Sequence, residues 1–396
     1  MCRPDQGVDF VKKILFFFVV AAMFSGCSRQ DETACKGDSY IFPPIVAASA
    51  HIAVVEKPDA RNALLIGDAA KSLGPYLKRS GVKCHLLPEG KFDLIAVACS
   101  EMSEKSCGKL TRYLSENGIV VWLMDVEGVS ASSFRRRLCA FNFVQVHLWM
   151  PGEKRWLLVG RKSPREIKLS AMLEYYSRES VFDDFAFSRC TSLQEVFANY
   201  VGDRESIMPA FERGDMSAAV KPEFFLERNV SNVKWISREG VDKDIAAEVF
   251  AKIREMQKVR REVVEGNIMS ALAKDRKSES AATDIWSKAA EKNPNDLFLL
   301  ERIDRLERNA KGFMEVKKVL MAMKCYETMA LIRPNDPVAL YNFGMCLKEI
   351  GKLDVAQKVL DRAKQLGLAE KLNVEHSSRP RAQRVNGNAD EQEKKE

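Results

Sequence analysis

Residues 63–74 read ALLIGDAAKSLG, and this stretch sets the fold that the sequence predicts. Four apolar residues, 63–66, lead into Gly67 and then into a segment with the composition of a helix. A buried strand followed by a glycine turn and a helix is typical of the first unit of a doubly wound α/β domain, whose turn lies at the ligand-binding edge of a parallel sheet. The turn, Gly67-Asp68-Ala69-Ala70, holds a single glycine. The sequence therefore predicts a strand, a turn and a helix over these residues. It does not decide whether the turn binds a ligand.

Strand and helix patterns alternate on both sides of this stretch, from residue 40 to residue 165. Continuous apolar runs predict buried strands, and amphipathic stretches that end in glycine or asparagine predict helices between them. A Pro151-Gly152 turn joins the last two strands as a hairpin. We expect a mostly parallel sheet with an antiparallel edge, covered by helices. The predicted strands are 52–55, 63–66, 84–87, 93–99, 119–124, 143–149 and 156–159, and the predicted helices are 69–80, 105–116 and 130–141.

Four motifs in this region follow one order: ALLIGD, FDLIAVA, LTRYLSENGIVVW and FNFVQVHLWMPGEKRWLLVGRK. In this order the chain resembles the class I methyltransferase fold, and within it the spermidine synthase branch. Residues 216–228, MSAAVKPEFFLER, are similar to the closing segment of that family. The resemblance covers about residues 60–228. It implies a Rossmann-like sheet domain with a cofactor loop after the first strand.

The cofactor loop departs from the family pattern. The resemblance places cofactor-binding roles on Gly67, Asp68 and Glu89. Ala69 and Ala70 stand where the family has glycines, which let the backbone close on the cofactor because they lack a Cβ. We therefore interpret Gly67, Asp68 and Glu89 as vestiges of a cofactor site and expect no bound cofactor.

Two further departures concern the segment that usually cradles the adenine of the cofactor and the carboxylate that acts on the substrate. The segment between Glu89 and Phe92 is too short for the helix and strand that the family has there. Ala98 takes the place of the carboxylate that accepts a proton in aminopropyl transfer, which an alanine cannot do. We therefore predict no catalytic residue.

Residues 1–26 have the pattern of a lipoprotein signal peptide. Lys12 and Lys13 precede an apolar run over residues 14–24. This run is too short to cross a bilayer, since a spanning helix needs about 20 residues. The run ends in Phe24-Ser25-Gly26-Cys27, which resembles a bacterial lipobox. The resemblance implies cleavage before Cys27 and a diacylglycerol on its thiol.

This motif predicts a lipid-anchored protein of the bacterial cell envelope, with residues 27–39 as a tether. Ser28 after the cysteine favours the outer membrane, facing the periplasm. Asp5 and Asp9 are unusual before a signal peptide, so both Met1 and Val11 are open as the start of the protein.

The chain beyond the sheet is predicted to be helical. Residues 166–240 form a connector with helices over 167–176, 192–201 and 205–211. A long helix begins near residue 242 and opens a helical domain over residues 241–372. Residues 373–396 are polar and charged without apolar periodicity, which predicts a disordered tail.

Three stretches of the helical domain share a small-large-small pattern. Its central residues are Trp286, Tyr326 and Leu360, and the pattern begins at the alanines of positions 282, 322 and 356. The middle copy carries an insertion, and Pro-Asn-Asp follows each of the first two copies. A period of about 34 residues with this pattern resembles the tetratricopeptide repeat, which implies a surface that binds another protein. The last copy matches best, at Leu340, Phe343, Gly344, Leu347, Ala356, Leu360 and Ala363.

Composition excludes several classes of site. The formal charge of +7 comes from 62 basic and 55 acidic residues that are mixed along the chain, so we expect no nucleic-acid partner. Ten cysteines and four histidines form neither a C-x-x-C nor an H-E-x-x-H motif, so we expect no metal site. The cysteines are expected mostly as small buried hydrophobic residues, and disulfide pairing stays open.

These patterns predict a membrane-anchored, non-catalytic scaffold or protein-interaction lipoprotein. It would bind the membrane through acyl chains on Cys27 and a protein partner through its helical repeats. The alternative is an aminopropyl- or methyltransferase, or a small-molecule binder, that uses a remodelled cleft for a polyamine or an S-adenosylmethionine derivative.

Overall fold

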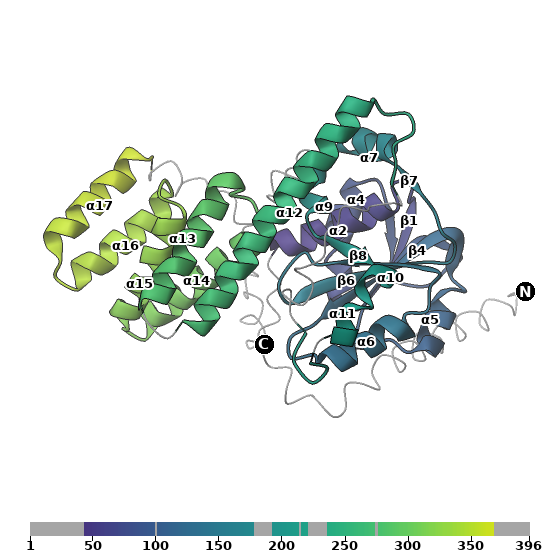
Figure 1. The fold of residues 1–396 in the computed structure, drawn as a ribbon, viewed down its shortest axis with the longest axis horizontal. Helices are drawn as coiled ribbons and strands as arrows, with labels where there is room; N and C mark the ends of the chain where they lie inside the picture. The colour runs from purple at the N-terminus through teal and green to yellow at the C-terminus, as the bar shows by residue number, and fades with distance from the viewer. Residues whose placement is uncertain are drawn as a thin grey trace, which may run out of the picture. The chain divides into compact units, whose positions relative to one another are not determined.

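The computed structural model describes residues 43–99, 101–177, 192–213, 215–220, 236–273 and 276–367. The predicted signal peptide, Cys27, the tether and the tail lie outside these residues. The chain divides into two compact units, residues 1–302 and 303–396. A β-sheet covered by helices belongs to the first unit, and helices form the C-terminal part of the chain (Figure 1).

The first unit is built on a seven-stranded sheet of order β2-β1-β3-β4-β6-β5-β8. Strands β2, β1, β3 and β4 are parallel, whereas β6, β5 and β8 each pair antiparallel with the preceding strand in this order. This confirms the predicted mixed, mostly parallel sheet with an antiparallel edge. Its strands are β1 (Asn62–Ile66), β2 (Lys83–His85), β3 (Phe92–Ala98), β4 (Leu114–Asp125), β5 (Gln145–Trp149), β6 (Arg155–Arg161) and β8 (Tyr200–Asp203), and a separate parallel pair joins β7 (Ile167–Lys168) and β9 (Ile236–Ser237).

Helices bury both faces of the sheet, because successive side chains of a strand point to opposite faces. In β4, Ile119 and Val121 join the core on one face, and Val120 and Trp122 join the core on the other. The first face is covered by α2 (Pro43–Glu56), α4 (Gly74–Arg79), α7 (Leu169–Tyr176), α9 (Leu193–Phe197) and the start of α12 (Lys243–Leu272). The second face is covered by α5 (Glu104–Leu110), α6 (Ala131–Ala140), α10 (Arg204–Ile207) and α11 (Ala210–Arg213).

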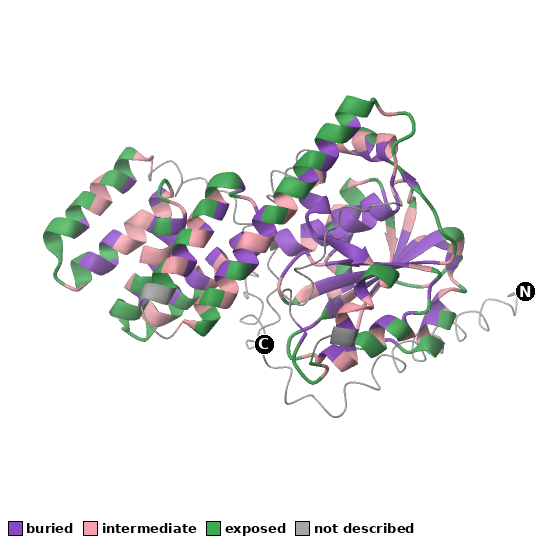
Figure 2. Ribbon diagram, viewed as in Figure 1, coloured by how far each residue is buried: buried purple, intermediate pink, exposed green. Residues whose placement is uncertain are grey.

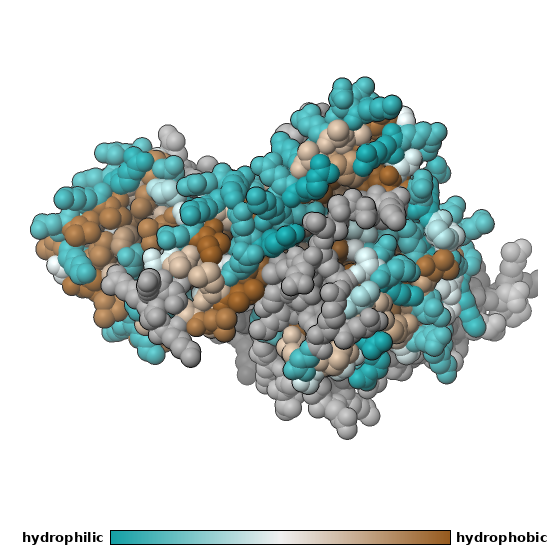
Figure 3. Space-filling view, viewed as in Figure 1, coloured by the Kyte–Doolittle hydropathy of each residue, from teal (hydrophilic) through white to brown (hydrophobic). Residues whose placement is uncertain are grey.

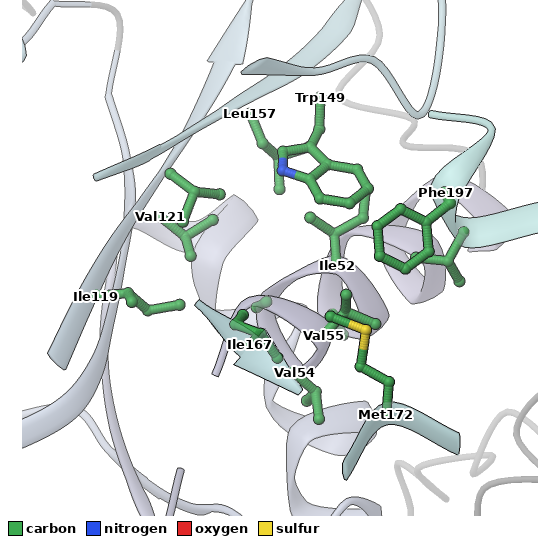
Figure 4. Close-up of a cluster of buried hydrophobic side chains, with 14 of the residues drawn as sticks. Ile52, Val54, Val55, Ile119, Val121, Trp149, Leu157, Ile167, Met172 and Phe197 are labelled. Atoms are coloured by element: carbon green, nitrogen blue, oxygen red, sulfur yellow. The ribbon is translucent and has the colours of Figure 1, made fainter. Parts of the chain in front are cut away.

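Helix α2 replaces the strand that the sequence predicted over residues 52–55, so this prediction was wrong. The helix is buried along its whole length and has almost no polar side (Figure 2). A short apolar run that is buried all round has no periodicity that separates a strand from a helix. Figure 4 shows Ile52, Val54 and Val55 of α2 packed among side chains of the sheet and of α9, Trp149 and Phe197 among them.

Several predicted boundaries were also wrong. The helix predicted to end at residue 116 ends at Leu110, and β4 already begins at Leu114, with a register shift opposite the start of β3. The helix predicted over 69–80 is split into α3 (Asp68–Lys71) and α4. The helix predicted over 192–201 ends at Phe197, and the chain then turns into β8 because Tyr200 pairs with the end of β5.

The link between β2 and β3 consists of residues 86–91 and contains neither helix nor strand. This confirms the short connection predicted between Glu89 and Phe92. Strand β2 therefore forms the edge of the sheet, directly beside β1.

The C-terminal helices follow one another through short turns. They are α12, α13 (Arg276–Lys292), α14 (Leu297–Glu315), α15 (Val319–Ile332), α16 (Pro337–Glu349) and α17 (Leu353–Gln365). The two Pro-Asn-Asp turns end in the same way, since Asp296 caps the start of α14 and Asp336 caps the start of α16. In each case the aspartate side chain accepts hydrogen bonds from the backbone N–H groups two and three residues further along the chain.

Small residues allow the helices of a pair to approach closely. A Cβ at Gly344 of α16 would come within 2.8 Å of the Leu360 side chain of α17. In the first unit, a Cβ at Gly266 of α12 would come within 2.8 Å of the Trp286 indole of α13. With 19 residues against 13, α14 is longer than α16 by six, which places the predicted insertion in the first helix of the middle pair.

The predicted repeat residues lie mainly on the inner sides of these helices. Gly344, Leu347, Ala356 and Ala363 are buried, whereas Leu340, Phe343 and Leu360 are half-buried. No helix in the described ranges is both long and apolar enough to span a membrane.

Candidate functional site at the carboxyl edge of the sheet

Gly67 is required by the path of the backbone. It has a φ of 88° and precedes α3, and a Cβ at this position would overlap the carbonyl oxygen of Ala98 at the end of β3. Residues other than glycine rarely adopt this backbone conformation. The glycine is therefore explained by the close approach of the turn after β1 to the end of β3, whether or not a ligand binds here.

The close approach of Gly67 to Ala98 predicts how Gly67→Ala changes stability. We expect the substitution to lower the free energy of unfolding by about 2–4 kcal/mol, because the left-handed backbone and the overlap with Ala98 both oppose a side chain. Gly81→Ala is the matched control, since Gly81 also has a positive φ, of 83°, but no atom within 4 Å of a Cβ. Urea unfolding of both variants measures the difference. Equal losses would contradict the overlap with Ala98.

The carboxylates predicted as vestigial ligands face solvent. Asp68 and Glu89 follow the ends of the neighbouring strands β1 and β2, so they lie at the same edge of the sheet as Gly67. The Asp68 side chain is 98% exposed and accepts a hydrogen bond of 2.8 Å from Lys71. This hydrogen bond and the charge of Lys71 lower the pKa of Asp68. Glu89 is exposed in the link between β2 and β3. Both predicted ligands thus belong to the solvated surface of this edge.

The two alanines of the turn pack against the protein. Ala70 is fully buried in the core between the sheet and α2. Ala69 lines a small pocket at the carboxyl edge, together with Ile45, Val46 and Ser49 of α2 and residues at the end of β4 and the start of β6. The space beside the turn is thus occupied by protein side chains.

This pocket has a cavity volume of about 20 Å³. A single water molecule needs about 10–15 Å³, and sites for small organic ligands usually have about 300–1,000 Å³. Its lining is mainly apolar and includes Leu73, Leu123 and Trp156. In this conformation the pocket admits about one water molecule and no nucleoside.

A buried ionic cluster, which the sequence did not indicate, lies at the other end of α2. Glu56, the last residue of α2, accepts hydrogen bonds from His147 Nδ1 (2.8 Å), Trp149 Nε1 (2.8 Å) and Arg161 Nη2 (2.7 Å). Arg161 also donates to the Glu56 carbonyl oxygen. Burial would raise the pKa of the Glu56 carboxyl, but the charges of His147 and Arg161 and their hydrogen bonds lower it to about 2. The cluster fixes α2 to strands β5 and β6.

A second buried cluster joins α12 to the sheet. Arg260 binds Asp296 through Nε (2.6 Å) and donates from Nη1 to Asn199 Oδ1 (2.8 Å) and to the Met150 carbonyl oxygen (3.2 Å). Its guanidinium lies 4.4 Å from the centre of the Phe298 ring. Asp296 also caps α14, so one ion pair connects the end of β5 with the middle of α12 and the start of α14.

Neither cluster has an entrance for a substrate, because Glu56, His147, Arg161, Arg260 and Asp296 are all buried. We therefore interpret both clusters as contributions to the stability of the fold. The first cluster was not predicted from the sequence; the signal that could have found it is an acidic residue at the end of an apolar run, a position that is unfavourable in a helix without a cationic partner. In the part of the chain that the structure describes, no group of three His, Cys, Asp or Glu residues could hold a metal ion.

Comparisons with known proteins add little to this geometry. No protein-family model and no curated protein matches the chain. Among solved structures it is similar to the crystal structure of the M1A22 tRNA methyltransferase TrmK of B. subtilis, with 12% sequence identity and a TM-score of 0.21. The similarity covers 65% of this chain and 100% of that chain. We draw no conclusion about activity from a similarity of this size.

Proposed function

We propose that this protein is a membrane-anchored, non-catalytic scaffold. Its sheet domain would descend from a spermidine synthase-like or methyltransferase-like enzyme, and its C-terminal helices would be tetratricopeptide-like repeats that bind a protein partner. Acyl chains on Cys27 would hold it in the bacterial cell envelope, at the outer membrane and facing the periplasm.

The packing of α2 against the turn after β1 carries the proposal. Ile45, Val46 and Ser49 lie where the turn and the ends of β4 and β6 meet, and they leave a cavity of about 20 Å³. Ala98 at the end of β3 supplies no proton acceptor. With a pocket of this size beside the turn and no carboxylate at position 98, the edge supports a structural role better than group transfer.

The helix pairs support the interaction role. Ala322 and Tyr326 of α15 are buried, and the same small-large spacing recurs in α17 at Ala356 and Leu360. Stacked helix pairs of this type expose a continuous side of their first helices, which is the usual protein-binding surface of such arrays.

Fractionation and affinity purification test the proposal. The full-length protein is expressed with a C-terminal tag, either unchanged or as Cys27→Ala, and cross-linked before membranes are collected. We expect the unchanged protein in the membrane fraction with one protein partner in stoichiometric amount, and less Cys27→Ala in that fraction. Equal membrane recovery of both forms would contradict the lipid anchor, and the absence of any co-purified protein would contradict the scaffold role.

A further inference from the structure

Exposed apolar side chains gather at one end of the second unit. Val316, Leu320 and Met321 surround the turn from α14 to α15, with exposures of 61%, 60% and 46%. Leu353 and Val355 begin α17, with exposures of 61% and 50%. Isolated exposed apolar residues are common in soluble proteins, but a contiguous group marks an interaction surface.

The two groups lie at the same end of the helices. Four residues link α15 to α16 and three link α16 to α17, so consecutive helices run antiparallel. Since α16 packs on both neighbours, the start of α15 and the start of α17 both lie near the end of α16. Figure 3 shows apolar surface in brown over the region that Figure 1 labels α15, α16 and α17. We call Val316, Leu320, Met321, Leu353 and Val355 the turn-end patch.

Lysines are interspersed in this patch. Lys317, Lys318 and Lys352 are exposed, and Lys318 and Lys352 directly precede α15 and α17, at equivalent positions of the two turns. Lys348 is exposed one residue before the end of α16. Three acidic residues, Glu315, Glu349 and Asp354, are also exposed nearby, so the patch has a small net positive charge.

Lys317 adopts a conformation that favours glycine. Its φ is 55°, and it is the one described residue other than glycine with a positive φ. Lys318 N–H then bonds to the Phe313 carbonyl oxygen, as Lys352 N–H bonds to the Leu347 carbonyl oxygen in the next turn. The residue equivalent to Lys317 in that turn is Gly351, with a φ of 82°. A lysine at a position that favours glycine raises the question of what its side chain contacts.

We propose that the turn-end patch docks on the surface of a lipid bilayer that contains anionic lipids. The apolar side chains stand on turns and helix starts, from which they can enter the acyl boundary, and the lysines beside them can reach phosphate groups. This mixture of protruding apolar residues and lysines fits a lipid surface better than the folded surface of a protein. The inference rests on the membrane location of the proposed function, and it adds a second contact that is independent of the acyl chains.

Vesicle co-sedimentation tests this contact with residues 28–396, which contain every residue that the structure describes. The vesicles are phosphatidylcholine alone or with about 30% phosphatidylglycerol. We expect tighter binding to the anionic vesicles, roughly five-fold for each lysine that reaches the surface. The double variant L320S/L353S should bind at least about ten-fold more weakly, because it removes two side chains that enter the membrane. Leu331→Ser is the matched control, since Leu331 is 55% exposed at the other end of α15.

Lys317→Gly separates binding from folding. We expect this variant to unfold at a higher urea concentration than the unchanged protein, because glycine relieves the positive φ, and yet to bind anionic vesicles roughly five-fold more weakly. Lys252→Ala, at an exposed position of α12, should leave binding unchanged. Equal binding of L320S/L353S and Leu331→Ser would overturn the proposal, as would no binding to either vesicle or capture of a soluble protein by the patch instead. Because the protein tested lacks Cys27, such a failure would leave the lipid anchor standing.

Discussion

Replacing Glu56 by alanine is expected to lower the free energy of unfolding by about 3–5 kcal/mol, because it leaves the buried guanidinium of Arg161 without its carboxylate. Arg161 is 3% exposed, and the Glu56 side chain is fully buried. His147 and Trp149 lose the same acceptor, in a space that water does not reach.

Urea unfolding measures this loss as a lower midpoint at an unchanged dependence on urea. Arg165→Ala is the control, because Arg165 pairs with Asp59 on the surface, with 40% and 56% of the two side chains exposed. An exposed pair of this kind contributes about 0–1 kcal/mol. A loss for Glu56→Ala no larger than that of the control would contradict the role of the cluster.

The same carboxyl predicts how stability depends on pH. Its pKa is lowered from 4.5 to about 2 in the folded protein. A group with a lowered folded pKa stabilises the fold above its unfolded pKa and loses this effect as the pH falls toward the folded pKa. We therefore expect about 3 kcal/mol of stability to be lost between pH 4.5 and pH 2. Glu56→Gln should show a smaller loss over this range in unfolding measured at a series of pH values.

Replacing Arg260 by alanine is expected to lower the free energy of unfolding by a similar amount, about 3–5 kcal/mol, since the Asp296 carboxylate is fully buried and would lose its cationic partner. The substitution also removes the donor to Asn199 and to the Met150 carbonyl oxygen. Helix α12 and the start of α14 would then lose their polar connection to the end of β5.

Lys292→Ala provides the comparison for Arg260→Ala. Lys292 of α13 bonds to Glu262 of α12 at 2.7 Å, but its side chain is 45% exposed. We expect a change below about 1 kcal/mol for this variant. Hydrogen exchange can locate the effect: Arg260→Ala should raise exchange in α12 and at the start of α14. Unchanged exchange there would show that Arg260 does not hold these helices to the sheet.

The sheet was predictable because its central strands are continuous apolar runs, as in residues 93–99 and 119–124. Helix α2 was not, because a segment buried on every side lacks the polar positions from which a helical period is recognised. Strand β8 was missed for another reason: Tyr200 lies just beyond an amphipathic turn, and only its pairing with Trp149 at the sheet edge fixes it as a strand.

The sequence predicted which residues of the candidate site depart from a cofactor-binding pattern, but it did not predict which side chains pack beside them. The sequence identified Ala69, Ala70 and Ala98 as departures from a cofactor-binding pattern. It did not indicate that Ile45, Val46 and Ser49 occupy the adjacent space, because they were not assigned to a helix that crosses this edge. Long-range packing of this kind and the pairing of Glu56 with Arg161, 105 residues apart, depend on tertiary structure.

Our proposal that the carboxyl edge of the sheet does not bind a nucleoside cofactor is tested by calorimetric titration of residues 28–396. S-adenosylmethionine, its decarboxylated form and spermidine would each be added up to millimolar concentration. We predict no heat of binding and no rise in the melting temperature, for the unchanged protein and equally for A69G/A70G, because α2 occupies the space in both. Micromolar binding of any of the three, with the rise in melting temperature that such binding to the folded state produces, would contradict the account.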